Sequence, residues 1–184
     1  QDWEIDNKKT YHPILLFNGD VFQGIDPASL NEEDISLMQK NLRIISGLYG
    51  LLKPLDYILP YRLEMGVKIN NIYGDNLYDF WGQKLRDALI SEMPLEEVLI
   101  NLASNEYSKA LHLDSFPRKV ITPVFKDYKN GKLKTISFFA KKARGRMVNF
   151  IIKNKISNIS DLRLFNDGGY CFNKGGQEEM LFVR

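Results

Sequence analysis

The sequence is poor in the residues that bind soft metals or form disulfides. Its 184 residues include one cysteine, Cys171, and two histidines, His12 and His112. A single cysteine cannot form an internal disulfide, and this scarcity is typical of reducing compartments, so we expect a cytoplasmic location. Because the three side chains are scattered along the chain, we also expect no metal site and no cofactor.

Long apolar runs and the common catalytic motifs are missing as well. No apolar stretch approaches the roughly 20 residues of a membrane-spanning helix, so we expect no membrane association. The patterns GxSxG, HExxH, CxxC and the Walker phosphate loop do not occur, and neither histidine follows or precedes a plausible nucleophile. A hydrolase with a catalytic triad is therefore not indicated.

The length and composition predict a single domain over residues 1–184, and we expect a monomer. The chain is 44% hydrophobic, enough for a core of ordinary size. It begins with Gln1 rather than Met, and residues 1–13 are polar without clear periodicity. We therefore expect that an N-terminal portion of a longer protein precedes this chain.

The positive charge is concentrated in one window of the sequence. Residues 126–155 contain ten cations and one anion, Asp127, a net charge of +9, whereas the rest contains 15 cations and 22 anions, a net charge of −7. Such asymmetry indicates either a polyanionic partner or pairing of the two parts across the fold. A solvated basic face explains it equally well.

The alternation of apolar and polar residues predicts an α+β fold, with a mixed β-sheet, surrounding helices and a late β-hairpin. We expect strands at 14–17, 42–46 and 97–104, helices at 31–41, 75–93, 105–111 and 142–156, a loop at 18–27, and an irregular segment at 51–66. Asn31 is the expected N-cap of the first helix, with acids in its first turn. Two further short strands are expected within 162–184. The hairpin joins strands at 118–128 and 133–140, because Asn130-Gly131 suits a turn that needs two positive φ angles.

The segment KKARGR, residues 141–146, stands where the second hairpin strand is expected to lead into a helix. If that helix begins near Ala140, its first turn holds cations, which is the unfavourable sign for the helix dipole unless an anion binds there. We therefore predict a phosphate site formed by Lys141, Lys142, Arg144 and Arg146. The alternative is that the lysines face solvent and Gly145 packs against a neighbouring backbone.

Two other stretches supply candidate phosphate contacts. Lys126, Lys132 and Lys134 are expected on one face of the hairpin, leading towards the cluster, although lysines also protect sheet edges from aggregation. Lys53 and Arg62 lie in the irregular segment that follows a predicted strand. Arg62 and Glu64 are two residues apart, so in an extended chain they share a face, either as an ion pair or around a phosphate.

The stretch LASNEYSKAL, residues 102–111, supplies candidate catalytic groups. It follows a predicted strand, at the edge where α/β folds place their sites. Glu106 is a candidate general base with Lys109 nearby, and Glu64 is the third candidate. Helix capping by Ser104 and Asn105 explains the same pattern.

Four blocks of this sequence together resemble the YaaA family of bacterial peroxide-stress proteins. They lie at residues 46–66, 102–111, 125–152 and 168–184, and the resemblance runs from about Gly19 to Arg184. Family members start with a longer N-terminal segment containing a Ser-Pro-Ala-Lys stretch, which is not found here.

The resemblance implies a fold peculiar to the family and three functional expectations. They are protection from hydrogen peroxide, limitation of free intracellular iron, and DNA binding through a positively charged cleft. It also implies a helix-hairpin-helix element, but the glycines of residues 42–50 have the wrong spacing for one. Combined with the basic window, it predicts contacts to the DNA backbone with weak sequence specificity.

Two alternatives remain. The first is an enzyme acting on a nucleotide or nucleic acid, with a phosphate site near Arg62, Glu64, Glu106 and the 141–146 cluster. The second is direct iron handling, which dispersed carboxylates and few histidines make the weakest of the three.

Overall fold

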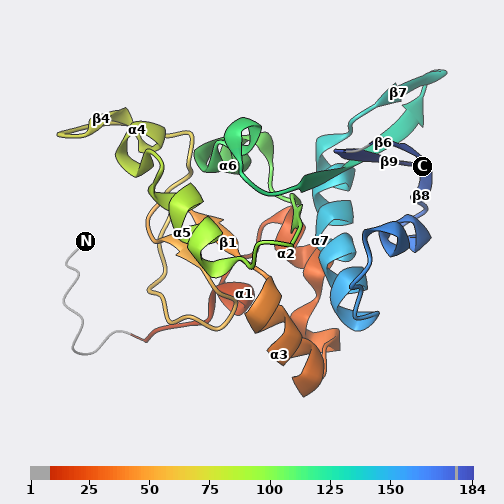
Figure 1. Ribbon diagram of the computed structural model, residues 1–184, viewed down its shortest axis with the longest axis horizontal. Helices are drawn as coiled ribbons and strands as arrows, with labels where there is room; N and C mark the ends of the chain where they lie inside the picture. The colour runs from red at the N-terminus through yellow and green to blue at the C-terminus, as the bar shows by residue number, and fades with distance from the viewer. Residues whose placement is uncertain (1–8, 177) are drawn as a thin grey trace.

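A computed structural model describes residues 9–176 and 178–184 of the chain (Figure 1). The first half contains α1 (Pro13–Leu16), α2 (Asp20–Ile25), η1 (Pro27–Ser29), α3 (Glu32–Asn41), β1 (Ile44–Ser46), β2 (Gly50–Leu52), β3 (Lys68–Asn71), β4 (Gly74–Asn76), α4 (Leu77–Trp81) and α5 (Lys84–Glu92). The second half contains β5 (Leu99–Ile100), α6 (Asn105–Ser108), η2 (Lys109–Leu111), η3 (Leu113–Ser115), β6 (Val120–Lys129), β7 (Lys132–Lys134), α7 (Ser137–Lys153), η4 (Ile159–Leu164), β8 (Cys171–Gly175) and β9 (Glu179–Val183).

The largest sheet is mixed, which confirms the predicted α+β class. Its strands follow the order β5-β6-β9-β8, and β7 pairs with β6 beside this path. The β5–β6 and β6–β9 pairs are parallel, whereas β6–β7 and β8–β9 are antiparallel. Two small antiparallel sheets, β1–β2 and β3–β4, lie apart from it.

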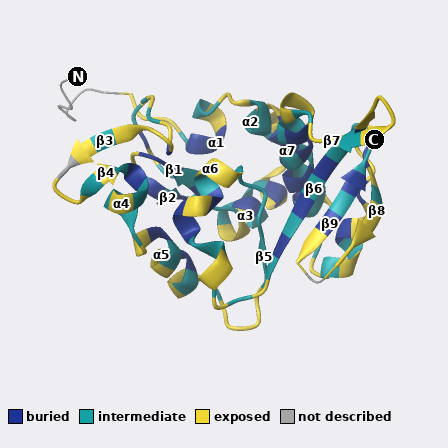
Figure 2. Cartoon of the chain, turned by 90° about the horizontal axis from the view of Figure 1, so that it is seen from above, coloured by how far each residue is buried: buried dark blue, intermediate teal, exposed yellow. Residues whose placement is uncertain are grey.

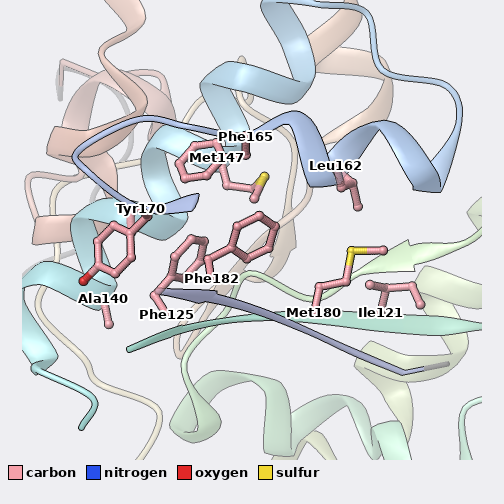
Figure 3. Packing of buried hydrophobic residues seen from close by; sticks show 10 residues of the cluster. Ile121, Phe125, Ala140, Met147, Leu162, Phe165, Tyr170, Met180 and Phe182 are labelled. Carbon is pink, nitrogen blue, oxygen red and sulfur yellow. The ribbon is translucent and has the colours of Figure 1, made fainter. Parts of the chain in front are cut away.

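Helix α7 and η4 cover one face of the main sheet. Burial alternates along β6, so that Ile121 and Phe125 point into the core while their neighbours are only partly buried (Figure 2). Phe125 stacks on Phe182 of β9 at a centroid distance of 5.4 Å, and Met147 of α7 lies above them (Figure 3). Burying a side chain of this size contributes roughly 1.5–3 kcal/mol, so this cluster holds α7 on the sheet.

Helix α7 packs on its other side against α2, through two glycines. A Cβ at Gly145 would overlap the carbonyl oxygen of Val21, and a Cβ at Gly24 would overlap that of Lys142. The alternative interpretation of Gly145, close packing on a neighbouring backbone, is therefore confirmed. The prediction of a loop at 18–27 is wrong, because α2 occupies 20–25 and its backbone provides that contact.

The prediction of a strand at 14–17 is also wrong. These residues form most of α1, whose first residue is Pro13, a favoured residue at the start of a helix because it lacks an N–H. Ile14 packs with residues of α2, α3 and α7. A four-residue apolar run does not distinguish a strand from a buried helix, so only the tertiary packing decides.

Several other expectations are confirmed. Asn31 caps α3 in a capping box with Asp34, with hydrogen bonds of 2.9 and 3.2 Å. Asn130 and Gly131 have φ angles of 54° and 71°, as the predicted hairpin turn requires. The two strands expected near the C-terminus are β8 and β9.

The helix expected at 75–93 is interrupted. Gly82, with φ of 50°, separates α4 from α5, although the apolar spacing continues across it. Trp81 lies at the end of α4, and its indole N–H donates to the carbonyl oxygen of Gly47 at 3.0 Å. The break places Trp81 and Leu85 together over β1–β2 and α6.

No helix in the described part of the chain is long and apolar enough to cross a membrane.

Candidate functional site

The helix that carries KKARGR begins earlier than the sequence predicted. Helix α7 starts at Ser137, and the amide of Ala140 already donates to the carbonyl oxygen of Ile136 at 2.9 Å. Residues 141–146 therefore lie in the second and third turns, where their amides hydrogen bond within the helix. The prediction of a helix N-terminal anion site at this cluster is wrong.

The four cations of the cluster do not converge on one point. Successive residues of an α-helix are about 100° apart around its axis, so Arg144 and Arg146 lie on opposite flanks. Lys141 pairs with Asp20 at 3.7 Å, and Arg146 pairs with Asp167 at 3.3 Å. Lys142 lies 4.6 Å from the ring centroid of Phe138. A single phosphate cannot contact all four side chains.

Arg144 is the cluster residue with the most unusual environment. It is partly buried, and this burial lowers the pKa of its guanidinium group. Among residues 9–176 and 178–184 no acid pairs with it. A desolvated cation without a counter-ion is costly, which makes Arg144 a candidate contact for an anion supplied from outside the chain.

The hairpin lysines do not share one face, which corrects a second prediction. In the register of the β6–β7 ladder, Lys134 lies opposite Asp127 and Lys132 lies opposite Lys129. Residues directly opposite one another in an antiparallel ladder have their side chains on the same face of the sheet. That face contains the inward-pointing residues of β6, whereas Lys126 alternates to the other face. The tip of the hairpin extends beyond the helices and is exposed (Figures 1 and 2).

Most of the positive charge in this window is unpaired. Three of its ten cations, Lys141, Arg146 and Lys155, form ion pairs with acids. Within the described residues the other seven do not, and we call them the basic surface: Lys126, Lys129, Lys132, Lys134, Lys142, Arg144 and Lys153. Pairing across the fold therefore accounts for only part of the charge asymmetry.

The only acid in this window does not neutralise these lysines. Asp127 is buried, and it accepts hydrogen bonds from the Tyr170 hydroxyl at 2.7 Å and from Arg184 Nε at 2.8 Å. Burial, together with the hydrogen bond and charge of Asp127, raises the pKa of Tyr170. Both oxygens of Asp127 are thus used inside the fold.

Lys53 and Arg62 lie away from the basic surface. Lys53 Nζ is 3.4 Å from the carboxylate of Glu92, which also pairs with Arg43 at 2.6 Å. Arg62 is exposed and, in the described ranges, makes no ion pair, so the expected pairing with Glu64 does not occur.

The candidate catalytic acids come together around Tyr107. Burial raises the pKa of Tyr107, and the charges of Glu106 and Glu64 raise it further. Glu106 Oε1 accepts a hydrogen bond of 2.9 Å from the Gly66 amide, which joins α6 to the segment after Glu64. Both carboxylates are exposed and therefore solvated.

Lys109 lies at the same site, through an aromatic contact that the sequence did not indicate. Its Nζ is 4.6 Å from the ring centroid of Tyr78, and the Tyr78 hydroxyl donates to the backbone oxygen of Glu106 at 2.9 Å. The hydroxyl of Tyr61 is 2.5 Å from Ser46 Oγ, and the charge of Tyr61 also raises the pKa of Tyr107. Tyr61, Tyr78 and Tyr107 come from three separate stretches of the sequence, and only the fold brings them together.

The described part of the chain contains no group of three or more His, Cys, Asp or Glu side chains arranged to hold a metal ion.

Comparison with known proteins identifies one family model and several relatives that are about half identical to this chain. The family model described as "Peroxide stress protein YaaA" matches residues 1–175. A UPF0246 protein of Colwellia psychrerythraea is 54% identical over 173 residues, covering 92% of this chain and 67% of that protein. One of Saccharophagus degradans is 48% identical over 190 residues, covering 100% of this chain and 74% of that protein.

The chain is shorter than these relatives. A third UPF0246 protein, from Aliivibrio fischeri, is 53% identical over 161 residues, which cover 86% of this chain but 62% of that protein.

Proposed function

Because the chain belongs to the family of the peroxide stress protein YaaA, we propose that it protects the cell from hydrogen peroxide by binding DNA through the basic surface. In this proposal the protein is cytoplasmic and monomeric, and it helps to limit free intracellular iron. The lysines and Arg144 contact backbone phosphates, which provide affinity but carry no sequence information, so sequence specificity is weak.

The observation that carries this proposal is the set of seven cations in the 126–155 window that form no ion pair with any described residue. A surface whose cations are neutralised by neighbouring acids has little attraction for a polyanion. Here Asp127 is used internally, and the lysines at the tip of the β6–β7 hairpin project into solvent. Two-stranded ribbons of this kind can follow a phosphate backbone or enter a groove.

The test is salt-dependent binding of a labelled blunt duplex, measured by fluorescence anisotropy. The hairpin variant replaces Lys129, Lys132 and Lys134 with Ala, and the matched control replaces the exposed lysines Lys40, Lys68 and Lys119. We expect the hairpin variant to bind all sequences more weakly and to flatten the log–log salt slope by about 0.9 for each lost phosphate contact. Equal affinity and slope in the two variants would refute the role of the hairpin.

A second function is favoured by one observation, the convergence of Glu64 and Glu106 around Tyr107. Carboxylates and a lysine amine are among the side chains that can act as general acids or bases on a nucleotide or nucleic acid. Turnover of a nucleic-acid substrate that Glu106→Gln abolishes, with an unchanged melting temperature, would establish this enzyme. Turnover that the substitution leaves unchanged would show that Glu106 is not a catalytic residue.

The proposed effect on iron does not require a bound ion. We expect anaerobic calorimetry with ferrous iron to show no saturable heat, and a saturable signal would instead establish direct iron binding.

A further inference from the structure

A surface pocket of about 400 Å³, which is open to solvent and which we call the cavity, lies between the second half of α7 and the turn that precedes β8. None of the functions considered above uses it as a binding pocket. Its lining consists of Arg146, Asn149, Phe150, Lys153, Asn154, Asn166, Asp167 and Gly168. Two cations, three carboxamides, one carboxylate and one aromatic ring therefore face a single cavity.

The cationic end of the cavity is held by Arg146. A Cβ at Gly168 would overlap the Arg146 guanidinium, and the φ of 62° at Gly168 also favours glycine. The Arg146–Asp167 pair is 3.3 Å long and its side chains are 38% and 59% exposed, so solvent weakens it. An incoming anion can replace Asp167 at little cost, although that carboxylate opposes anion binding until it moves.

The carboxamides provide hydrogen-bonding groups that the fold does not fully use. Asn149 Nδ2 donates a long hydrogen bond of 3.4 Å to Ser29 Oγ, and its Oδ1 is buried with no donor among the described residues. Such an acceptor gains from a ligand that brings it an N–H or O–H after a small side-chain rotation. Asn166 is exposed and, among the described residues, has no hydrogen-bond partner.

The direction of α7 gives the cavity a polarity. Its C-terminal end, at Lys153 and the C-cap Asn154, carries the negative end of the helix dipole, which disfavours an anion and favours hydrogen-bond donors. Arg146 is about two turns further from that end. A ligand with an anionic group at Arg146 and hydrogen-bond donors towards Asn154 matches both ends.

We propose that this cavity binds a nucleoside monophosphate, with its phosphate at Arg146 and its base and sugar among the three carboxamides beside Phe150. Carboxamides offer donors and acceptors together, which suits a base edge. The same unit occurs as a free nucleotide and as an unpaired nucleotide extruded from DNA. The second case rests on the DNA binding proposed above, whereas the first does not.

The first experiment is titration of the chain with deoxyadenosine monophosphate, monitored by isothermal calorimetry. We expect saturable binding that Asn149→Ala and Asn166→Ala each weaken about fivefold, the effect of losing one hydrogen bond. The control Asn173→Ala, an exposed residue of β8, leaves it unchanged. Inorganic phosphate is expected to bind at least about tenfold more weakly than the monophosphate, because it contacts Arg146 but not the carboxamides.

The second experiment separates the two sources of the ligand. It compares a blunt duplex with a duplex containing one extrahelical adenosine. A gain in affinity for the bulged duplex that Asn149→Ala removes, with blunt-duplex binding retained, identifies a nucleotide within DNA. No gain, alongside binding of the monophosphate, identifies a free nucleotide.

The two proposals can fail separately. Absence of saturable monophosphate binding, or equal affinity for monophosphate and inorganic phosphate, overturns the nucleotide cavity even if blunt duplex binds. Monophosphate binding without duplex binding overturns the proposed DNA-binding function and leaves the cavity assignment intact.

Discussion

The two ends of the molecule differ in how far their cations are paired with acids. At one end, seven cations of the β6–β7 hairpin and α7 have no acidic partner in the described chain, whereas Lys141 and Arg146 do, and the one acid of these elements, Asp127, is buried. At the other end, around β1–β4 and α4–α6, Arg43 and Lys53 share Glu92, and Lys109 lies over Tyr78 (Figure 1). Charges that satisfy one another stabilise a fold slightly, whereas unpaired charges of one sign remain available for a partner.

The largest expected effect comes from breaking the contact that fixes α7. Gly145→Val places a side chain where the Val21 carbonyl lies, so α2 and α7 must separate. We expect a loss of at least about 3 kcal/mol of unfolding free energy, measured by urea denaturation. As a control, Gly19→Ala, where nothing lies within 4 Å, should change stability by less than about 0.5 kcal/mol.

The next effect tests the one buried acid of the basic end. Asp127→Ala leaves the Tyr170 hydroxyl without its acceptor and Arg184 without its counter-ion. We expect a destabilisation of about 2–4 kcal/mol by thermal or urea unfolding. Asp75→Ala removes an exposed acid of the opposite end and is expected to be nearly neutral. Equal effects of the two substitutions would contradict the structural role of Asp127.

A smaller effect of opposite sign is expected at Arg144. Replacing this partly buried, unpaired cation with Met removes its desolvation cost and keeps its apolar stem, so stability should rise by about 1 kcal/mol. Duplex binding should weaken in the same variant if Arg144 contacts phosphate. The exposed control Arg62→Met should leave stability unchanged. A loss of stability in Arg144→Met would show that the guanidinium has a favourable structural partner.

The smallest effect concerns Glu92, the acid shared by Arg43 and Lys53, and it depends on pH. Burial raises the pKa of Glu92, but the hydrogen bonds and charges of Arg43 and Lys53 outweigh this and lower the pKa below its ordinary value of 4.5. A lowered folded pKa stabilises the protein above the unfolded value, and the benefit is lost as the pH falls through the folded value.

The Glu92 side chain is 36% exposed, so Glu92→Gln should cost less than about 1 kcal/mol at pH 7. The difference from the unsubstituted protein should disappear at strongly acidic pH, measured by urea unfolding across the pH range. A constant difference at all pH values would exclude the ion pairs as its cause.

Local signals in the sequence determined the features that depend on neighbouring residues. Asn31 followed by Asp34 was sufficient for the cap of α3, and Asn130-Gly131 for the hairpin, because each depends on a few dihedral angles and short-range hydrogen bonds. The excess of cations at 126–155 was also visible in the composition, since net charge does not depend on the fold.

Only the tertiary structure decided which of these charges act together. The cluster at 141–146 looked like one site, but the start of α7 at Ser137 leaves it beyond the helix N-terminus, and the helical repeat separates Arg144 and Arg146 onto opposite flanks. The register of β7 placed Lys132 and Lys134 on the face opposite Lys126. Gly24 and Gly145 are 121 positions apart, and Glu64 and Glu106 are separated by three strands and two helices. Contacts over such separations depend on packing and pairing register, which a residue's own neighbours in the sequence do not specify.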